Sequence, residues 1–219
     1  MVRYTLAAAA CALGLVFAAG NPATAGDDNG KRKHNEISFD MVVSAAAKTC
    51  LPNATARVKV VSTGTAEDMT IHASGLPANT GFDFFVIQVP NAPFGLSWYQ
   101  GDVQTDDDGE AIQHFRGRFS IETFIVAPGV APAPFVFNGP FPDATMNPAT
   151  NPVQIYHLGL WFDSPKDAMA ANCPATVTPF NGEHDAGIQV LNTSNFPIDF
   201  GPLRCLPDRS SCPVFVGSH

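Results

Sequence analysis

The side chains best suited to acid–base or metal chemistry are Glu183, His184 and Asp185, which follow one another directly. A neighbouring carboxylate orients an imidazole for proton transfer, and imidazole is a common metal ligand. We therefore name these three residues as a candidate binding site and His184 as a candidate metal ligand. A polar turn accounts for the same residues equally well, because no HExxH or H-x-H spacing accompanies them. Further histidines fall on predicted strands, from which they would have to converge on His184: His72, His114 and His157.

An acidic run at residues 106–110 suits a hard cation. Asp106 and Asp108 offer the carboxylate oxygens that Ca²⁺ prefers, so both are candidate metal ligands. The EF-hand spacing is not met, because Phe115 stands where a bidentate glutamate is required. Asp108 followed by Gly109 is also a favoured hairpin turn. A solvated turn between two strands is therefore the alternative.

Three large aromatic residues, Trp98, Tyr99 and Trp161, flank predicted turns or loops. With the phenylalanines of a proline-rich loop they would line a groove for an apolar or glycan ligand. Alternatively, each ring caps the core at one end of the domain. The chain has 17 Phe against three Tyr and two Trp. Phe has no polar group, so this composition indicates core filling rather than stacking on sugars or bases.

The sequence lacks the common catalytic signatures. It contains no G-x-S-x-G nucleophile elbow, no glycine-rich phosphate loop and no dinucleotide fingerprint. A glycosidase needs two carboxylates that can be distant in sequence. Nothing singles out such a pair among the available residues, which are Asp83, Asp102, Glu122 and Asp163. We expect no cofactor and favour a non-catalytic protein.

Residues 1–25 have the order of a secretory signal peptide. Arg3 precedes an apolar run over residues 6–19, and Ala23 and Ala25 occupy the −3 and −1 positions of a cleavage site. We expect a secreted protein, periplasmic if the source cell has two membranes. The apolar run is shorter than the roughly 20 residues of a membrane span, so no membrane anchor should remain after cleavage. Two sequons, beginning at Asn53 and Asn192, have meaning only in a eukaryotic secretory route and are treated as incidental.

Export also decides how the cysteines are used. Cys11 lies in the predicted leader, which leaves four cysteines in the mature chain. An even number in an exported protein indicates disulfides, and four cysteines allow three pairings. We predict that Cys205 bonds Cys212 across a short loop, and that Cys50 bonds Cys173.

The chain is acidic, with a formal net charge of −8. Nucleic-acid-binding domains carry a basic face. The main basic cluster here, at residues 31–33, lies in a polar tail over residues 26–36 that we predict to be disordered. We therefore expect no nucleic-acid partner, and instead an unidentified extracellular ligand or envelope component.

The elements that must position these residues are almost all strands. Runs rich in β-branched and aromatic residues, separated by Gly, Pro, Asn and Asp, are typical of strands joined by turns. Ser164 and Pro165 begin one short helix, which should end near Asn172. Residues 127–152 carry seven prolines and form a long loop. The predicted strands cover residues 37–43, 57–62, 69–74, 82–89, 97–105, 110–119 (with continuation to 126 as the alternative), 153–162 and 187–192, with 213–216 as a further edge strand.

This pattern predicts an all-β protein, an antiparallel β-sandwich with one short helix and a long Pro-rich loop, as a single domain over residues 37–219. Residues 69–88 and 101–119, with the turns GLPANTG and TDDDG, resemble a recurring pattern in uncharacterised secreted bacterial β-sandwich proteins. The resemblance implies an immunoglobulin-like or superoxide-dismutase-like sandwich. The histidine pairs that hold the metals of copper–zinc superoxide dismutases are absent here, so the resemblance implies no active-site residue.

Two functions remain from these observations. The first is a secreted, non-catalytic binding or envelope-associated structural module. The alternative is an exported metalloprotein or hydrolase that uses His184 with Glu183 or Asp185.

Overall fold

The computed structural model describes residues 36–119, 124–125, 153–181 and 184–206, which are mostly antiparallel β-structure. Eight strands form one sheet in the order β5-β4-β9-β12-β1-β2-β3-β6. Their bounds are β1 Glu36–Val43, β2 Thr55–Ser62, β3 Glu67–Ser74, β4 Gly81–Ile87, β5 Ser97–Gln104, β6 Ala111–Gly117, β9 His157–Phe162 and β12 Gln189–Asn192.

The remaining described elements are short. They are two small sheets, of β7 Phe124–Ile125 with β8 Val153–Gln154 and of β10 Thr178–Asn181 with β11 His184–Ala186, the helix α2 Pro165–Ala170 and the 3₁₀ turn η2 Pro202–Cys205. No helix of the described residues is long and apolar enough to cross a membrane. The predicted leader, the tail up to residue 35, the loop over residues 127–152 and the edge strand over 213–216 lie outside the described residues.

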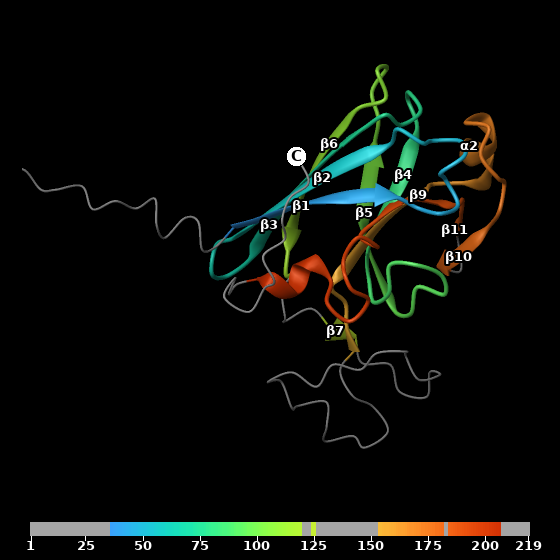
Figure 1. Ribbon diagram of the computed structural model, residues 1–219. Coiled ribbons are helices and arrows are strands. Elements are labelled where there is room, and N and C mark those ends of the chain that lie inside the picture. The colour runs from blue at the N-terminus through green and yellow to red at the C-terminus, as the bar shows by residue number, and fades with distance from the viewer. Residues whose placement is uncertain (1–35, 120–123, 126–152, 182–183, 207–219) are drawn as a thin grey trace, which may run out of the picture.

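The large sheet consists of two halves joined at a corner. In one half, β1 pairs with β2 along residues 36–41, and β2, β3 and β6 continue the ladder. The junction with the other half is short, because β1 pairs with β12 through Val42↔Asn192 and Val43↔Leu191. Figure 1 shows the strands β1 and β2 running steeply across the direction of β4 and β5.

The two outer strands of the sheet, β5 and β6, approach each other and nearly close it into a barrel-like shape. Phe84 of β4 and Phe115 of β6 stack across the interior, with ring centroids 5.4 Å apart. Gly101 of β5 has a φ of +146° and faces the same ring, so that a Cβ there would lie 2.9 Å from Phe115 Cε1. A glycine is therefore required where the edge strands meet.

Side-chain alternation places the core inside the curved sheet. In β2 the side chains of Ala56, Val58 and Val60 are buried, whereas Arg57 and Lys59 between them are exposed. This period of two is the one predicted for strands with one wet face. The alternation predicted for β6 is also confirmed, since its His114 and Arg116 are exposed.

β4 is buried on both faces, as its nearly continuous apolar sequence predicts. Phe82, Phe84 and Val86 belong to the interior core. Phe85 and Ile87 point the other way, into a second apolar cluster on the outside of the sheet. Because β4 lies between β5 and β9, its outer face needs a cover from elsewhere in the chain.

The strand predicted from residue 110 to about residue 119, with continuation to 126 as the alternative, ends at Gly117. β3 begins at Glu67, which pairs with Gly117, so the ladder has no further partner strand. Instead, the Glu67 carboxylate accepts a hydrogen bond of 2.8 Å from the Phe119 backbone N–H. The Phe119 ring is buried in the core.

Two other predicted elements are present but differ in extent. The single strand predicted over residues 153–162 is divided into β8 and β9, because β8 pairs with β7 instead of joining the large sheet. The helix is confirmed, with Ser164 Oγ accepting the Asp167 backbone N–H at 3.2 Å. It ends at Ala170, and Asn172 adopts a left-handed φ of 58° that cannot continue a helix.

Gly101→Ala should lower the free energy of unfolding by about 2–3 kcal/mol, because it combines an unfavourable φ with displacement of the Phe115 ring. Gly64→Ala is the matched control. Gly64 also has a positive φ, of +87°, but nothing lies within 4 Å of its added Cβ, so a loss of about 1 kcal/mol is expected. Urea unfolding of both variants measures the difference. Equal losses would show that the contact with Phe115 does not matter.

Candidate ligand-binding groove

Trp161 is the largest side chain on the covered outer face of β4 and β9. Its side chain is fully buried, and its ring makes edge contacts with Phe85 at 5.3 Å and Phe94 at 5.1 Å between centroids. Ala186 of β11 completes this outer cluster with Ile87. The β4–β5 loop, which carries Phe94, and the β10–β11 hairpin therefore lie side by side on the sheet (Figure 1).

The β4–β5 loop is held by buried amide side chains of β12. Gln189 Nε2 and Asn192 Nδ2 each donate to the Pro90 carbonyl oxygen at 3.1 Å. Asn192 Nδ2 also donates to Gln189 Oε1 at 2.8 Å, and Asn91 Oδ1 lies 3.3 Å from Asn192 Nδ2. Within the loop, Gln88 Oε1 accepts the Leu96 backbone N–H at 3.1 Å. These bonds fix the loop in one position, because a buried amide without its partner is costly.

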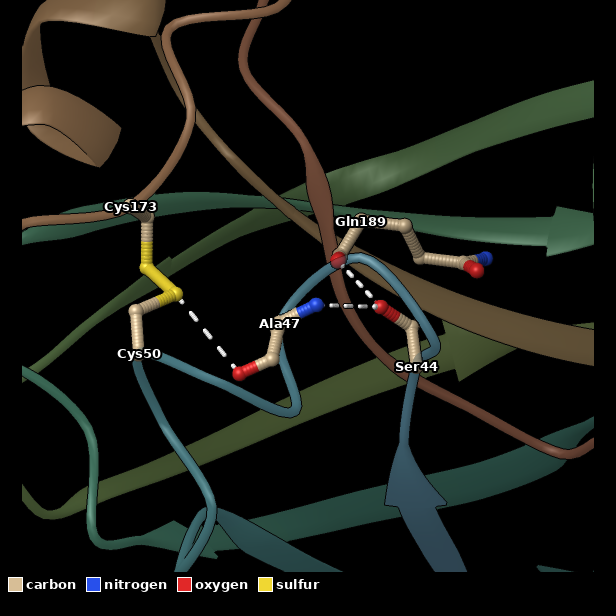
Figure 2. The surroundings of a disulfide bond; sticks show 5 residues. All are labelled: Ser44, Ala47, Cys50, Cys173 and Gln189. Carbon is tan, nitrogen blue, oxygen red and sulfur yellow. Dashed lines mark hydrogen bonds between the residues drawn. A yellow bond between two sulfur atoms is a disulfide. The ribbon is translucent and has the colours of Figure 1, made fainter.

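A second segment, residues 44–46, follows β1 and also lies against β12. The Ser44 backbone N–H donates to the Val190 carbonyl at 2.8 Å. The Ser44 hydroxyl donates to the Gln189 carbonyl and accepts the Ala47 backbone N–H at 3.3 Å (Figure 2). The start of the β1–β2 loop is therefore bonded directly to β12.

A third segment, residues 174–178, leads from α2 into β10. Its position is tied to the β1–β2 loop by a disulfide between Cys50 and Cys173, whose Cα atoms are 5.3 Å apart (Figure 2). This is one of the two pairings predicted from the sequence. Cys205 is also disulfide-bonded, but Cys212, its predicted partner, lies outside the described residues, so that pairing stays a prediction.

These three segments enclose a groove of about 1120 Å³. Among the described residues, none of the side chains that line it is charged, and their polar atoms are hydroxyls, amides and backbone groups. Such a lining suits an uncharged ligand with apolar surface. The lining residues are Ser44, Ala45, Ala46, Asn91, Ala92, Pro93, Phe94, Gly95, Leu96, Ser97, Pro174, Thr176, Val177, Thr178, Ile188 and Gln189.

The candidate residues around His184 lie in the neighbouring hairpin. His184 and Asp185 are in β11, opposite Asn181 and Pro179 of β10, instead of in the alternative polar turn. Asp185 is exposed, Glu183 lies outside the described residues, and of His184 only the backbone is described. Asp185 is not among the described residues that line the groove.

The candidate calcium ligands lie in the turn between β5 and β6. Asp106 Oδ1 accepts the backbone N–H groups of Asp108 at 3.0 Å and Glu110 at 2.9 Å. Gly109 takes the positive φ, +74°, that this turn requires. One carboxylate oxygen is therefore used by the turn itself. In the described parts of the chain, no group of three or more His, Cys, Asp or Glu side chains is arranged to hold a metal ion.

The other histidines do not gather with one another. His72 and His114 are exposed on the neighbouring strands β3 and β6, where His114 Nδ1 lies 2.9 Å from Thr70 Oγ1. His157 is buried on β9, in the other half of the sheet.

His157 holds a different segment in place. Its Nε2 donates to the Ile198 carbonyl at 3.0 Å, and its Nδ1 accepts from the Thr193 hydroxyl at 2.9 Å. Thr193 Oγ1 in turn accepts the Leu158 backbone N–H at 3.1 Å. This chain of bonds satisfies the neutral imidazole completely. Burial lowers the pKa of His157 to about 4, and the hydrogen bonds to backbone carbonyls oppose that shift only in part.

The aromatic candidates separate into exposed and buried rings. Trp98 and Tyr99 are 60% and 42% exposed on β5. The Tyr99 hydroxyl donates to the Asp102 carboxylate, and burial followed by this bond raises the Tyr99 pKa above its usual value. Neither ring lines the groove, whereas Ser97, the preceding residue, does. Trp161, the third candidate, packs beneath the loop and offers no surface to a ligand.

The groove residues themselves were not predicted from the sequence. The run Pro90, Asn91, Ala92, Pro93 carries turn signals that mark a shaped loop. Asn192 begins a sequon, a motif that indicates an exposed side chain, but the Asn192 side chain is fully buried. No family model matches this chain, and no curated protein matches it.

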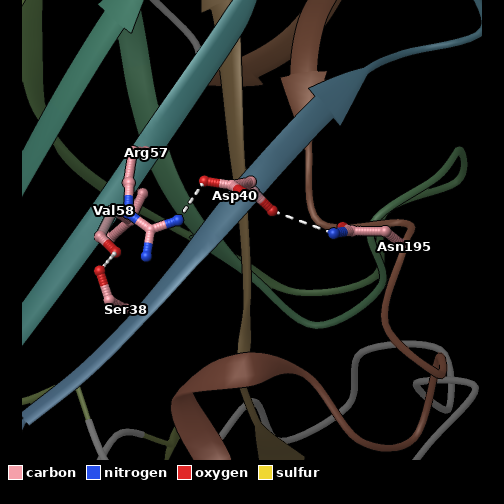
Figure 3. A network of polar contacts seen from close by, with 5 residues as sticks. All are labelled: Ser38, Asp40, Arg57, Val58 and Asn195. Carbon is pink, nitrogen blue, oxygen red and sulfur yellow. Dashed lines mark hydrogen bonds and ion pairs between the residues drawn. The ribbon is translucent and has the colours of Figure 1, made fainter. Parts of the chain in front are cut away.

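Asn192→Ala should lower the free energy of unfolding by about 2 kcal/mol, because it removes several buried hydrogen bonds at once. Asn195→Ala is the matched control. Asn195 is exposed and makes one bond of 3.0 Å, to the Asp40 backbone carbonyl, while Arg57 holds the Asp40 carboxylate (Figure 3). We expect a loss below about 0.5 kcal/mol for the control. Urea unfolding measures both, and similar losses would contradict a special role for Asn192.

Acid should weaken the fold through His157. Its pKa is about 4 in the folded protein and about 6.5 in an unfolded chain. Between these values the unfolded state binds a proton that the folded state does not, so stability falls as the pH falls from 6.5 to 4. The loss attributable to this group is about 3 kcal/mol.

Urea unfolding at pH 7 and pH 4.5 checks this effect by comparing the wild type with His157→Gln, in which the pH dependence should be smaller. His72→Gln, at an exposed position, controls for the loss of an imidazole. If His157→Gln fails to fold, an NMR titration of the imidazole in the wild type gives its pKa directly. A value near 6.5 would contradict the prediction.

Proposed function

We propose that this chain is an exported, non-catalytic binding protein whose groove takes an uncharged extracellular ligand or a segment of an envelope component. The observation that carries the proposal is the groove lining, whose described side chains are all uncharged, in a chain with a net charge of −8. A surface groove of about 1120 Å³ with a partly apolar lining and uncharged described side chains suits an uncharged ligand that loses its contacts with water on binding.

Pre-organisation supports binding as the role of the groove. A disulfide, buried amides and the Ser44 hydroxyl fix the three segments that form its walls. A site that is already ordered loses little conformational entropy when it takes a ligand. Structural proteins have no need for such a hollow, so this argument favours a binding module over a purely structural one.

The chemistry of the lining supports a non-catalytic role. Among the described lining residues, the hydroxyls of serine and threonine are accompanied by no histidine, carboxylate or lysine. A hydroxyl nucleophile needs a base to take its proton. The described lining therefore offers groups that bind a ligand and no base that would activate a nucleophile.

Export is part of the proposal. The order of residues 1–25 indicates a signal peptide, and the Cys50–Cys173 bond suits an oxidising compartment such as the extracellular space or a periplasm. The acidic net charge argues against a nucleic-acid partner.

The architecture is part of the proposal as well. We infer that the two halves of the sheet act as the facing layers of a β-sandwich, the fold predicted from the sequence. The short β1–β12 junction and the crossing directions of the strands support this assignment (Figure 1), since layers of orthogonal sandwiches meet at such corners. The approach of β5 to β6 favours the alternative, a barrel.

Val177→Arg should weaken binding of the uncharged dye Nile red, which reports apolar sites by its fluorescence. Val177 lines the groove and is 45% exposed, so the substitution places a charge in the site without disturbing the core. We expect affinity to fall by about tenfold or more, because the cation would lose hydration when the dye enters.

Met169→Arg is the matched control, because Met169 is 61% exposed on α2 and does not line the groove. Its dye affinity should equal that of the wild type. A wild type that does not bind the dye, or equal weakening in both variants, would contradict the groove as a binding site.

A further inference from the structure

The Cys50–Cys173 disulfide joins two walls of the groove. Cys50 closes the loop that contributes Ser44, Ala45 and Ala46 to the lining, and Cys173 directly precedes the wall formed by residues 174–178. We propose that this bond is a redox switch for the groove: the oxidised protein binds ligand, and reduction by an external dithiol releases the wall at residues 174–177 and with it the ligand. The inference rests on the proposed function, since it concerns regulation of the same site.

The wall at residues 174–177 depends on its two ends. Within the described part of the chain, these four residues make no backbone hydrogen bond. At one end is Cys173, which is held by the disulfide and by a bond of 2.8 Å from its N–H to the Ala168 carbonyl. At the other end Thr178 pairs with Ala186. All four residues are exposed, so packing holds them weakly.

The opposite wall keeps its shape without the disulfide. Ser44 is bonded to β12 by its backbone and by its hydroxyl. The Cys50 and Leu51 backbone N–H groups both donate to the Ala47 carbonyl, at 3.1 and 2.8 Å. Breaking the disulfide therefore removes the covalent cross-link next to the segment at 174–177, which is left tethered by the Cys173 backbone bond and by Thr178, and leaves the β1–β2 loop in place. Figure 2 shows how the bond joins the two loops.

The sheet does not need this bond either. Neither cysteine belongs to a strand, and no ladder pair of the eight-stranded sheet passes through Cys50 or Cys173. Cys50 is half-buried, whereas Cys173 is buried. Reduction therefore leaves every ladder pair of the large sheet in place, although Cys173 belongs to the edge of the core and Cys50 packs against it.

The chemistry is thiol–disulfide exchange. A thiolate of the dithiol attacks Cys50 Sγ, the more accessible sulfur, and Cys173 leaves as a thiolate that takes a proton. The second thiol of the reagent then attacks its own sulfur in the mixed disulfide and releases Cys50, which is protonated in turn. Two electrons and two protons pass to the two cysteines, and the dithiol becomes a cyclic disulfide.

The test compares the oxidised wild type with the double variant Cys50→Ser, Cys173→Ser. Nile red affinity measures the groove. Amide hydrogen exchange of residues 171–178, with β2 as the internal reference, reports the hydrogen-bonded amides of Ala171, Asn172 and Cys173 at the start of the wall. We expect the variant to bind the dye about tenfold more weakly or worse and to exchange faster at 171–178, with β2 unchanged. Dithiothreitol should produce the same changes in the wild type and none in the variant, which controls for reduction of the disulfide at Cys205.

Several results would overturn the switch. They are unchanged dye affinity in the variant, unchanged exchange at 171–178, or loss of protection in β2, which would mean that the bond holds the whole fold. Failure of the proposed function is distinguishable from these, because the oxidised wild type would then not bind the dye. Faster exchange at 171–178 in the variant would still show that the bond holds the wall.

Discussion

The architecture depends on one constraint: the outer face of β4 and β9 is apolar and must be covered. Curving the sheet buries one face of each strand, but Phe85, Ile87 and Trp161 point outward and are also removed from water. Burying such side chains is worth roughly 1.5–3 kcal/mol each. The β4–β5 loop and the β10–β11 hairpin supply the cover. Because two separate segments provide it, a groove remains between them and the loop that follows β1.

Covering a sheet with loops creates a second demand, because loops bring unpaired backbone groups with them. The Pro90 carbonyl would be such a group, and two amide side chains of β12 satisfy it. Polar residues are thus buried on a central strand where an all-apolar sequence would be expected. Their presence makes the loop a fixed part of the fold, which is what gives the groove a defined shape.

Sequence reasoning succeeded where local patterns determine structure. The alternation in β2, the two-faced apolar run of β4 and the Ser164 cap all predicted what the structure contains. The Cys50–Cys173 bond joins residues 123 apart, and it was predicted from the number of cysteines in an exported chain. Sequence reasoning failed at the other contacts between distant segments. The hydrogen bonds from Gln189 and Asn192 to Pro90 join residues that are 99 and 102 positions apart. No local sequence pattern predicts them. Trp161 looked available for a ligand because its cover comes from two other parts of the chain.

The burial of Asn192 bears on where this protein can be made. Its side-chain nitrogen lies among hydrogen-bond acceptors with no room for an added group, yet it begins an Asn-Thr-Ser sequon. Oligosaccharyltransferase modifies such sites on the nascent chain, before folding hides them. A glycan attached there would have to be accommodated inside β12. Production in yeast or mammalian secretory cells therefore works against the native state, and a bacterial host is the appropriate source.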